Sequence, residues 1–169
     1  MSGPPTFFRE LGLPEGMAGR VFLHSVLGRY RPFEEEEAEA LRLGVSAVVR
    51  PITDWETESR SPAYADAIRS RALGWEDLQF PIPDFGVPDN AEDFARLVDR
   101  VAAMLGEGRT ILVHCAAGIG RTGSFAAALL VRLGCGLEEA LRRVELAGSH
   151  AEDDCQLAFL RAFEAGIRG

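Results

Sequence analysis

Apolar residues gather in short runs along the chain, and each run is followed by a longer stretch of mixed polarity. Short runs rich in Val and Ile, bounded by turn residues, are typical of β-strands. The run at 110–115, TILVHC, is almost continuously apolar, as in a strand that is buried on both faces of a sheet. The pattern predicts four strands, at 21–26, 45–52, 78–82 and 110–115.

The stretches between these runs carry helical spacing and helix-boundary residues. Four acidic residues at 34–37 suit the positive end of a helix dipole, and Gly44 would end that helix. In 91–105 the apolar residues recur at helical spacing, and Asp89 or Asn90 can cap the N-terminus. The predicted helices are 34–43, 63–73, 91–105, a helix that ends at Leu133, 137–148 and 155–163.

Strands that alternate with helices indicate an α/β fold, with a central, mainly parallel sheet of about four to five strands flanked by helices. Residues 1–19 contain three Pro and four Gly and predict an irregular N-terminal lead-in. Segments 53–62 and 81–90 predict a polar loop and a proline-rich loop. No linker or internal repeat interrupts 20–169, so we expect one domain there.

The formal net charge of −8 disfavours an extended contact with nucleic acid or with an anionic membrane, because both require a positive face. The N-terminus lacks the charged start and apolar stretch of a signal peptide, and no apolar run reaches the roughly 18–20 residues of a membrane span. The three cysteines, Cys115, Cys135 and Cys155, form no CxxC pair, which disfavours a disulfide framework or a zinc site. We therefore expect a cytoplasmic protein.

The most informative segment is HCAAGIGRTG, which spans residues 114–123. A buried strand ends in Cys115, a glycine-rich turn follows, and Arg121 stands at the start of the next helix. The backbone N–H groups of such a turn and the positive end of the helix form a cradle for an anion. Arg121 can grip two phosphate oxygens with its guanidinium fork. The same positive field stabilises the thiolate of Cys115, which predicts a nucleophile beneath a bound phosphate.

Two other interpretations of this segment fit less well. A lone Cys at the end of a strand is usually a packing residue, but the glycine-rich turn and Arg121 argue against that here. Gly118, Gly120 and Gly123 also spell the dinucleotide-binding pattern G-x-G-x-x-G. That pattern requires an acidic residue at the end of the following strand, whereas the acidic residues about 20 positions on, at 138–139, fall within a predicted helix.

The segment resembles the signature loop of protein tyrosine phosphatases, His-Cys-(x)5-Arg-Ser/Thr. The resemblance implies a phosphatase-like fold, with Cys115 as the nucleophile that forms a phosphocysteine intermediate. It implies that Thr122 steadies the departing thiolate, and that His114 orients the loop and helps to stabilise the thiolate. It further implies phosphate binding by Arg121 and by the loop amides of Ala116, Ala117, Gly118, Ile119, Gly120 and Arg121.

The family also requires an acid that protonates the leaving group. PIPDFGVPD resembles the acid loop of small dual-specificity phosphatases and implies that Asp84 is this acid, with Asp89 as a rival that is better explained as a helix cap. EDDCQLAF resembles the segment in which the family places the hydrolytic water, which makes Gln156 a candidate for that role. Glu152 stands where the tyrosine-specific enzymes have a more important Gln, and it leaves the role of Gln156 open.

The resemblance spans about 20–165 and implies a compact, dual-specificity-type member that needs no metal or other cofactor. Because Ala116 and Ile119 replace the Lys residues of phosphoinositide phosphatases, the expected substrate is phosphotyrosine, with phosphoserine or phosphothreonine, in a protein, or a small phosphate monoester. A catalytically inactive phosphate-binding module and a nucleotide, RNA 5′-phosphate or lipid phosphatase are the alternatives. The retained Cys115 and Asp84 disfavour an inactive module.

Overall fold

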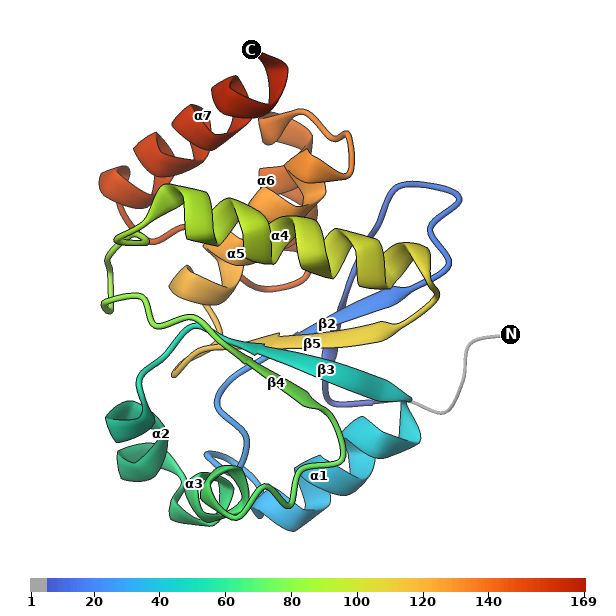
Figure 1. Cartoon of the computed structure of the whole chain (residues 1–169), viewed down its shortest axis with the longest axis vertical. Coiled ribbons are helices and arrows are strands. Elements are labelled where there is room, and N and C mark those ends of the chain that lie inside the picture. The colour runs from blue at the N-terminus through green and yellow to red at the C-terminus, as the bar shows by residue number, and fades with distance from the viewer. Residues whose placement is uncertain (1–5) are drawn as a thin grey trace.

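Four parallel strands form the centre of the structure and a short antiparallel strand borders them (Figure 1). The structure is a computed structural model that describes residues 6–169. The strand order in the sheet is β1-β2-β5-β3-β4. This sheet confirms the predicted α/β class. The strands are β1 (Arg9–Leu11), β2 (Arg20–His24), β3 (Val45–Arg50), β4 (Glu76–Gln79) and β5 (Thr110–His114).

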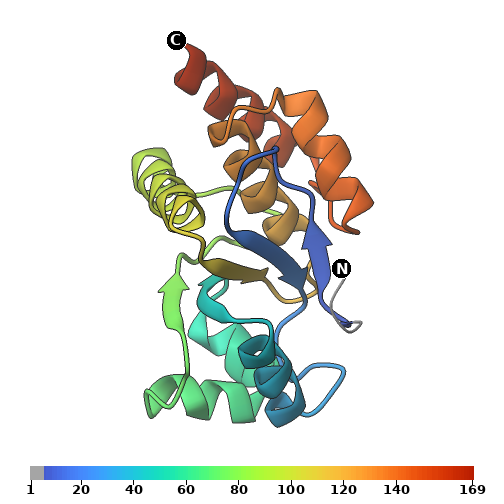
Figure 2. The ribbon, with the colours of Figure 1, turned by 90° about the vertical axis from the view of Figure 1, so that its right-hand side faces the viewer.

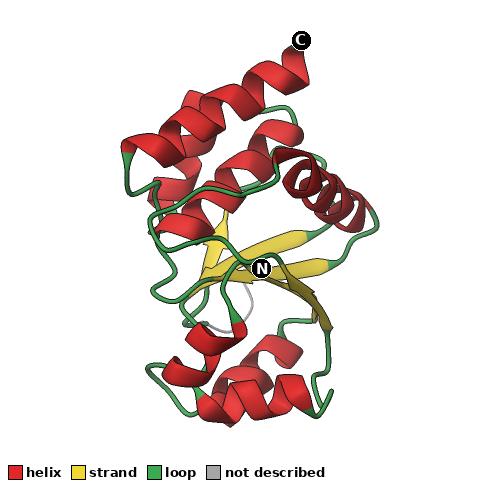
Figure 3. Cartoon of the chain, turned by 60° about the vertical axis from the view of Figure 1, so that its left-hand side comes forward, coloured by secondary structure: helices red, strands yellow, loops and turns green. Residues whose placement is uncertain are grey.

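Helices cover both faces of the sheet (Figures 2 and 3). One face carries the four helices that follow β4 in the chain, and the other carries the three helices that precede β4. The first group is α4 (Ala91–Gly106), α5 (Gly120–Arg132), α6 (Leu137–Leu146) and α7 (Asp154–Arg168). The second group is α1 (Phe33–Arg42), α2 (Asp54–Arg60) and α3 (Pro62–Arg69). None of the helices within residues 6–169 combines the length and apolar character needed to cross a membrane.

The central strand β5 faces a hydrophobic core on each side. Ile111 and Val113 belong to the core beneath α4–α7, whereas Leu112 belongs to the core beneath α1–α3. Because successive side chains of a strand point to opposite faces, a strand buried on both sides must be apolar throughout. Helix α5 is buried along almost its whole length, so the segment that follows the Cys115 loop is held rigidly.

Two sequence predictions are wrong, and of two residues predicted as alternative caps for α4 the structure selects one. Residues 9–11 of the predicted irregular lead-in form β1, while residues 1–5 of that lead-in lie outside the described residues. Segment 53–62 is not a loop, because Thr53 and Glu56 form a capping box that begins α2. This helix buries only Thr57 and shows no apolar spacing, so the hydrophobic pattern does not reveal it. The cap of α4 is Asn90 and not Asp89.

The four parallel strands end at the same edge of the sheet, and this edge gathers the loops that matter for function. In parallel sheets of this kind, ligands bind beyond the carboxyl ends of the strands. The loops that leave the strands there are 25–32 after β2, 51–53 after β3, 80–90 after β4 and 115–119 after β5.

Candidate active site

The loop between β5 and α5 curls around the sulfur of Cys115. Only 3% of Cys115 is exposed, and the Gly118 N–H donates a hydrogen bond of 3.3 Å to its Sγ. Gly118 has a φ of +80°, and a Cβ at this position would overlap the carbonyl of His24. Position 118 therefore requires glycine for two reasons: the backbone is left-handed there, and the end of β2 lies too close for a Cβ. This geometry directs an amide dipole at the sulfur, which favours a thiolate.

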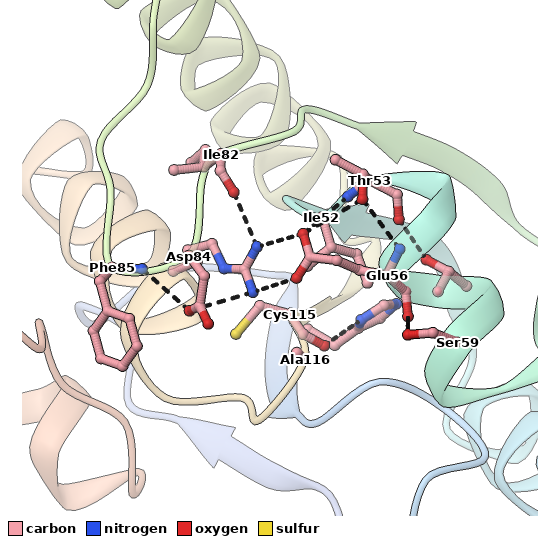
Figure 4. Close-up of polar contacts among 12 residues, drawn as sticks. Ile52, Thr53, Glu56, Ser59, Ile82, Asp84, Phe85, Cys115 and Ala116 are labelled. Carbon is pink, nitrogen blue, oxygen red and sulfur yellow. Dashed lines mark hydrogen bonds and ion pairs between the residues drawn. The ribbon is translucent and has the colours of Figure 1, made fainter.

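Arg121 lies in the first turn of α5 and is buried, with 2% of its surface exposed. Its Nη1 donates to Glu56 Oε1 and to the Ile82 carbonyl, each at 2.9 Å, and its Nη2 donates to Glu56 Oε2 at 2.8 Å (Figure 4). The guanidinium is thus held on one edge by a bidentate carboxylate and by the loop after β4. Fork-to-fork contacts of this type fix the orientation of the plane as well as the position of the charge.

The remaining donors of Arg121 are available for an anion. Its Nε–H makes no hydrogen bond with any residue in the range 6–169, and the second N–H of Nη2 has only the Asp84 carboxylate nearby, at 3.5 Å. Nε and Nη2 form one edge of the guanidinium, and two parallel N–H groups on one edge match the spacing of two phosphate oxygens. The tether to Glu56 therefore leaves the anion-binding edge open.

Glu56 is a site residue that the sequence prediction missed. Burial works against its charge, but the hydrogen bonds from Arg121 hold the pKa of Glu56 below its ordinary value. Burial lowers the pKa of Arg121, but the hydrogen bonds to Glu56 and the attraction of Cys115 outweigh it and raise this pKa overall. The T-x-x-E pattern of residues 53–56 is the local signal that predicts the helix start, although it does not reveal the partner of Glu56.

Helix α2, which carries Glu56, is anchored by a buried arginine at the end of β3. Arg50 donates to both oxygens of Asp77, at 3.1 and 2.8 Å, and to Asp54 Oδ1 at 3.0 Å. It also lies 3.4 Å from the Thr57 hydroxyl. The side chain is buried, so these contacts are required to offset the desolvation of its charge. They bind α2 to strands β3 and β4 and so fix the place of Glu56.

Asp84 lies on the loop after β4, and the structure brings it to Arg121 (Figure 4). The Phe85 N–H donates to Asp84 Oδ1 at 3.1 Å, and Phe85 adopts a φ of +56°. In Figure 4 the Asp84 carboxylate and the Cys115 sulfur point toward one another. Within residues 6–169, no ion pair links Arg121 to Asp89. The geometry thus favours Asp84 over Asp89 as the acidic group of the site.

Gln156 is buried, and its amide makes one hydrogen bond through its oxygen and one through its nitrogen. Its Oε1 accepts a hydrogen bond of 2.7 Å from the Glu152 N–H, and its Nε2 donates to the Gly86 carbonyl at 3.2 Å. The side chain therefore connects the start of α7 with the loop that bears Asp84. Glu152 itself packs against Gly120, where a Cβ would overlap its carboxylate. Glu152 thus brings a carboxylate next to the residues that join the Cys115 loop to α5.

His114 and Tyr64 form a fully buried pair behind Cys115. Tyr64 Oη lies 2.8 Å from His114 Nε2, and His114 Nδ1 lies 3.1 Å from the Cys115 carbonyl. Burial raises the pKa of Tyr64 and lowers the pKa of His114 to about 3. The assigned roles follow: the tyrosine hydroxyl donates to Nε2, and Nδ1–H donates to the carbonyl. His114 is neutral and orients the loop without adding positive charge.

Thr122 follows Arg121 and is fully buried. Its hydroxyl has no hydrogen-bond partner among the described residues. Buried hydroxyls nearly always find a partner, because an unpaired one costs about 1–3 kcal/mol. The Thr122 hydroxyl is therefore free to act as a donor within the site.

The neutral state of His114 generates a prediction about stability. Below pH 6.5 the unfolded chain binds a proton on this residue that the folded chain does not, so the free energy of unfolding falls as the pH falls from 6.5 toward 3. By pH 5 the loss amounts to about 2 kcal/mol. Denaturant unfolding of the wild type and of His114→Asn at pH 7.5 and pH 5 measures it.

The His114→Asn variant should lose about 2 kcal/mol less than the wild type between these two pH values. The carboxylates and the other histidines are common to both proteins and cancel in the comparison. An equal pH dependence in both proteins contradicts the neutral state of His114.

Two curated relatives match parts of the chain. "Tyrosine-protein phosphatase 1" of Caenorhabditis elegans is 55% identical over 42 residues, or 24% of this chain and 4% of the relative. "Tyrosine-protein phosphatase non-receptor type 23" of Homo sapiens is 34% identical over 108 residues, or 59% of this chain and 6% of the relative. The chain thus spans only a small part of the length of these relatives.

Solved structures of phosphatases share the fold. Kinase associated phosphatase, in a variant whose catalytic-site cysteine is replaced by serine, superposes with a TM-score of 0.83 at 20% identity, over 99% of both chains. Tk-PTP in the active form gives a TM-score of 0.72 at 27% identity, over 95% of this chain and 99% of that one.

The comparison with family models also finds a phosphatase. The model described as "Polymorphic toxin system, DSP-PTPase phosphatase" matches residues 28–135, which is more than half of the chain. That range contains Glu56, Asp84, Cys115 and Arg121, which surround the anion cradle described above. The chain therefore belongs to this family of dual-specificity-type protein tyrosine phosphatases.

Proposed function

We propose that the chain hydrolyses phosphate monoesters, foremost phosphotyrosine in proteins, through a phosphocysteine intermediate on Cys115. One observation carries the proposal: an amide donates to the buried Cys115 sulfur at the end of β5, while the open edge of the tethered Arg121 lies one loop away. In such a site the thiolate can attack phosphorus, and the guanidinium can stabilise the charge on the phosphate oxygens in place of a metal.

In the first step the Cys115 thiolate attacks phosphorus while the bond from phosphorus to the tyrosyl oxygen breaks. Asp84 donates its proton to that oxygen, so the leaving group departs as a neutral phenol. The amides of residues 116–121 and the open edge of Arg121 hold the non-bridging oxygens as their charge shifts. The 3.5 Å contact between Arg121 and Asp84 supports this assignment, because it brings the Asp84 carboxyl group to the guanidinium that would hold the phosphate.

In the second step a water molecule attacks phosphorus and the P–S bond breaks. The Asp84 carboxylate, now without its proton, accepts one from the water. The free hydroxyl of Thr122 donates to the departing thiolate. Gln156 supports the loop that bears Asp84, because its amide is bonded to Gly86 and to the Glu152 N–H, and the second N–H of its Nε2 remains available to position the water.

Exposed aromatic residues favour an aryl phosphate as substrate. Tyr30, Trp55 and Phe85 are 70%, 76% and 56% exposed, and they lie on segments that follow β2, β3 and β4. These segments leave the same sheet edge as the Cys115 loop. Large apolar side chains that remain this exposed can pack against the ring of a phosphotyrosine. This arrangement supports the preference for phosphotyrosine over phosphoserine or phosphothreonine.

A phosphoinositide is the less favoured substrate. A structure of PTPMT1 in complex with PI(5)P shares the fold at 22% identity. In this chain, however, Ala116 and Ile119 bring no charge to the loop, and Glu152 packs against Gly120 with a carboxylate. A second phosphate group on the substrate would meet that negative charge. These features support a monoester on a protein or on a small molecule.

We also propose that residues 20–169 form a single phosphatase domain, onto which β1 packs through its pairing with β2. A cytoplasmic location suits the proposed chemistry. A thiolate nucleophile is lost on oxidation, and the reducing cytosol protects it. Cys155 is exposed and Cys135 is partly buried, and neither has a disulfide partner in the described part of the chain.

Replacing the nucleophile tests the proposed mechanism. Cys115→Ser should abolish turnover of phosphotyrosine peptides, because a serine hydroxyl stays protonated where a thiol ionises. The cradle remains intact, so vanadate should still bind. Peptide turnover and calorimetric titration with vanadate measure the two effects. Turnover by the variant near the wild-type rate contradicts the assignment of Cys115.

The Asp84→Ala variant tests the acid. It should lower kcat on phosphotyrosine peptides by roughly 10²–10⁴-fold, because tyrosine is a poor leaving group that needs a proton. It should lower kcat much less on an aryl phosphate whose leaving group departs unaided. The alkaline limb of the pH–rate profile should vanish in the variant.

Asp89→Ala is the matched control and should behave like the wild type. If the Asp84→Ala variant loses kcat equally on both substrates and keeps the alkaline limb, a residue other than Asp84 is the acid.

The Glu56→Gln variant tests the tether of Arg121. Without the bidentate carboxylate the guanidinium loses its fixed orientation, and kcat should fall by roughly 10- to 100-fold. KM should change less, because removing a negative charge also makes the site more attractive to phosphate. Steady-state kinetics measure both constants. Glu58→Gln is the control on the same helix, since Glu58 is exposed and its one ion pair in the described part of the chain is with Arg69. A kcat within twofold of this control contradicts the role of Glu56.

A further inference from the structure

Two polar side chains hold the Gly118 carbonyl of the Cys115 loop. Arg9 of β1 donates from Nη2 to the Gly118 carbonyl at 2.8 Å, and the Ser149 hydroxyl donates to the same carbonyl at 2.6 Å. Arg9 also donates from Nη1 to Ser149 Oγ at 2.9 Å and to the Ala147 carbonyl at 2.7 Å. The Gly118 carbonyl is therefore fixed by two donors that are themselves joined.

The orientation of this carbonyl determines where the next amide points. In a trans peptide the C=O and the following N–H lie on opposite sides of the chain. Holding the Gly118 carbonyl toward Arg9 therefore turns the Ile119 N–H away from Arg9. The neighbouring Gly118 N–H already donates to Cys115 Sγ. Both amides then face the place where the proposed phosphate lies.

A second arginine, Arg29, fixes a carbonyl in the preceding part of the loop. Arg29 donates to the Ala116 carbonyl at 3.0 Å, and the Val26 N–H donates to that carbonyl at 3.1 Å. By the same peptide geometry the Ala117 N–H points away from Arg29. The directions of the Ala117 and Ile119 amides thus depend on hydrogen-bond donors that lie outside the loop.

The charge of Arg9 also reaches the site, and it is not neutralised nearby. The charge of Arg121 is offset by Glu56 and Asp84, whereas Arg9 forms no ion pair with any residue in the range 6–169. Burial lowers the pKa of Arg9, and attraction to Cys115 acts in the opposite direction. An uncompensated positive charge that contacts the loop stabilises an anion at the Cys115 sulfur.

We infer that Arg9 and Ser149 form an outer clamp, a pair of positioning residues that turn the Ile119 amide into the phosphate cradle, and that the charge of Arg9 stabilises the Cys115 thiolate. This role rests on the proposed function of the cradle. Both residues lie outside the 28–135 range that the family model matches. Strand β1, at the edge of the sheet, thereby becomes part of the catalytic apparatus.

Substitutions of Arg9 separate charge from geometry. Arg9→Met removes the charge and the donors but keeps a long apolar stem, Arg9→Lys keeps the charge and loses the fork, and Ser149→Ala removes one donor. Arg96→Met is the control, because Arg96 is exposed on α4 and, among residues 6–169, pairs only with acidic residues of its own helix. Each variant is first checked for folding by thermal unfolding.

Two readouts follow for every folded variant. The rate of alkylation of Cys115 by iodoacetamide across pH reports the fraction of thiolate, with Cys135 and Cys155 replaced by serine throughout. Calorimetric titration with orthovanadate reports the cradle. Arg9→Met should slow the alkylation of Cys115 and move the midpoint of its pH profile upward, because it removes a nearby positive charge. It should weaken vanadate binding by roughly tenfold or more.

Arg9→Lys should keep the alkylation midpoint near the wild type while vanadate binding weakens, and Ser149→Ala should weaken vanadate binding alone. If Arg9→Met matches Arg96→Met in both readouts, the clamp is overturned. It is also overturned if vanadate binding falls only in proportion to the folded fraction. Neither readout requires turnover, so a wild type that binds vanadate without hydrolysing phosphotyrosine would contradict the proposed function and leave the clamp standing.

Discussion

The ion pair between Arg121 and Glu56 is the interaction on which the geometry of the site depends. It joins the first turn of α5, on one face of the sheet, to α2, on the other face, across the carboxyl ends of the strands. A buried guanidinium requires a partner, because an isolated buried charge is strongly unfavourable. Glu56 satisfies one edge of Arg121 and leaves the other edge for the proposed phosphate. The proposed binding of a phosphate depends on this division of the donors.

The pair is held in turn by polar contacts that extend away from the site. Arg50, at the end of β3, fixes α2 through Asp54 and ties it to Asp77 of β4. On the other side, Gln156 links α7 to the loop that bears Asp84. The hydrophobic cores hold the layers together, whereas these buried polar contacts orient the individual side chains of the site. Catalytic orientation requires that second level of order.

The electrostatics of the cradle arise from the backbone and from arginines, not from histidine. The resemblance to tyrosine phosphatases implies that His114 helps to stabilise the thiolate, yet burial keeps it neutral, and its contribution is the hydrogen bond to the Cys115 carbonyl. The positive field comes from the Gly118 amide, the start of α5 and the arginines around the loop. An acidic protein with a net charge of −8 can therefore still bind an anion, because the field at the site is local.

The sequence by itself determined the local chemistry of this protein. Cys115, the glycines and Arg121 fall within a few consecutive residues, so their spacing along the chain already fixes their spacing in space, and the alternation of strands and helices predicted the layered sheet. Glu56 lies 65 positions from Arg121, and Arg9 lies 109 positions from Gly118. Contacts over such separations leave no periodicity in the sequence, and the elements that make them, α2 and the three-residue β1, are held by polar contacts and edge pairing instead of an apolar stripe. Only the tertiary structure decided them, because it is the packing of the layers that brings these charged side chains to one edge of the sheet.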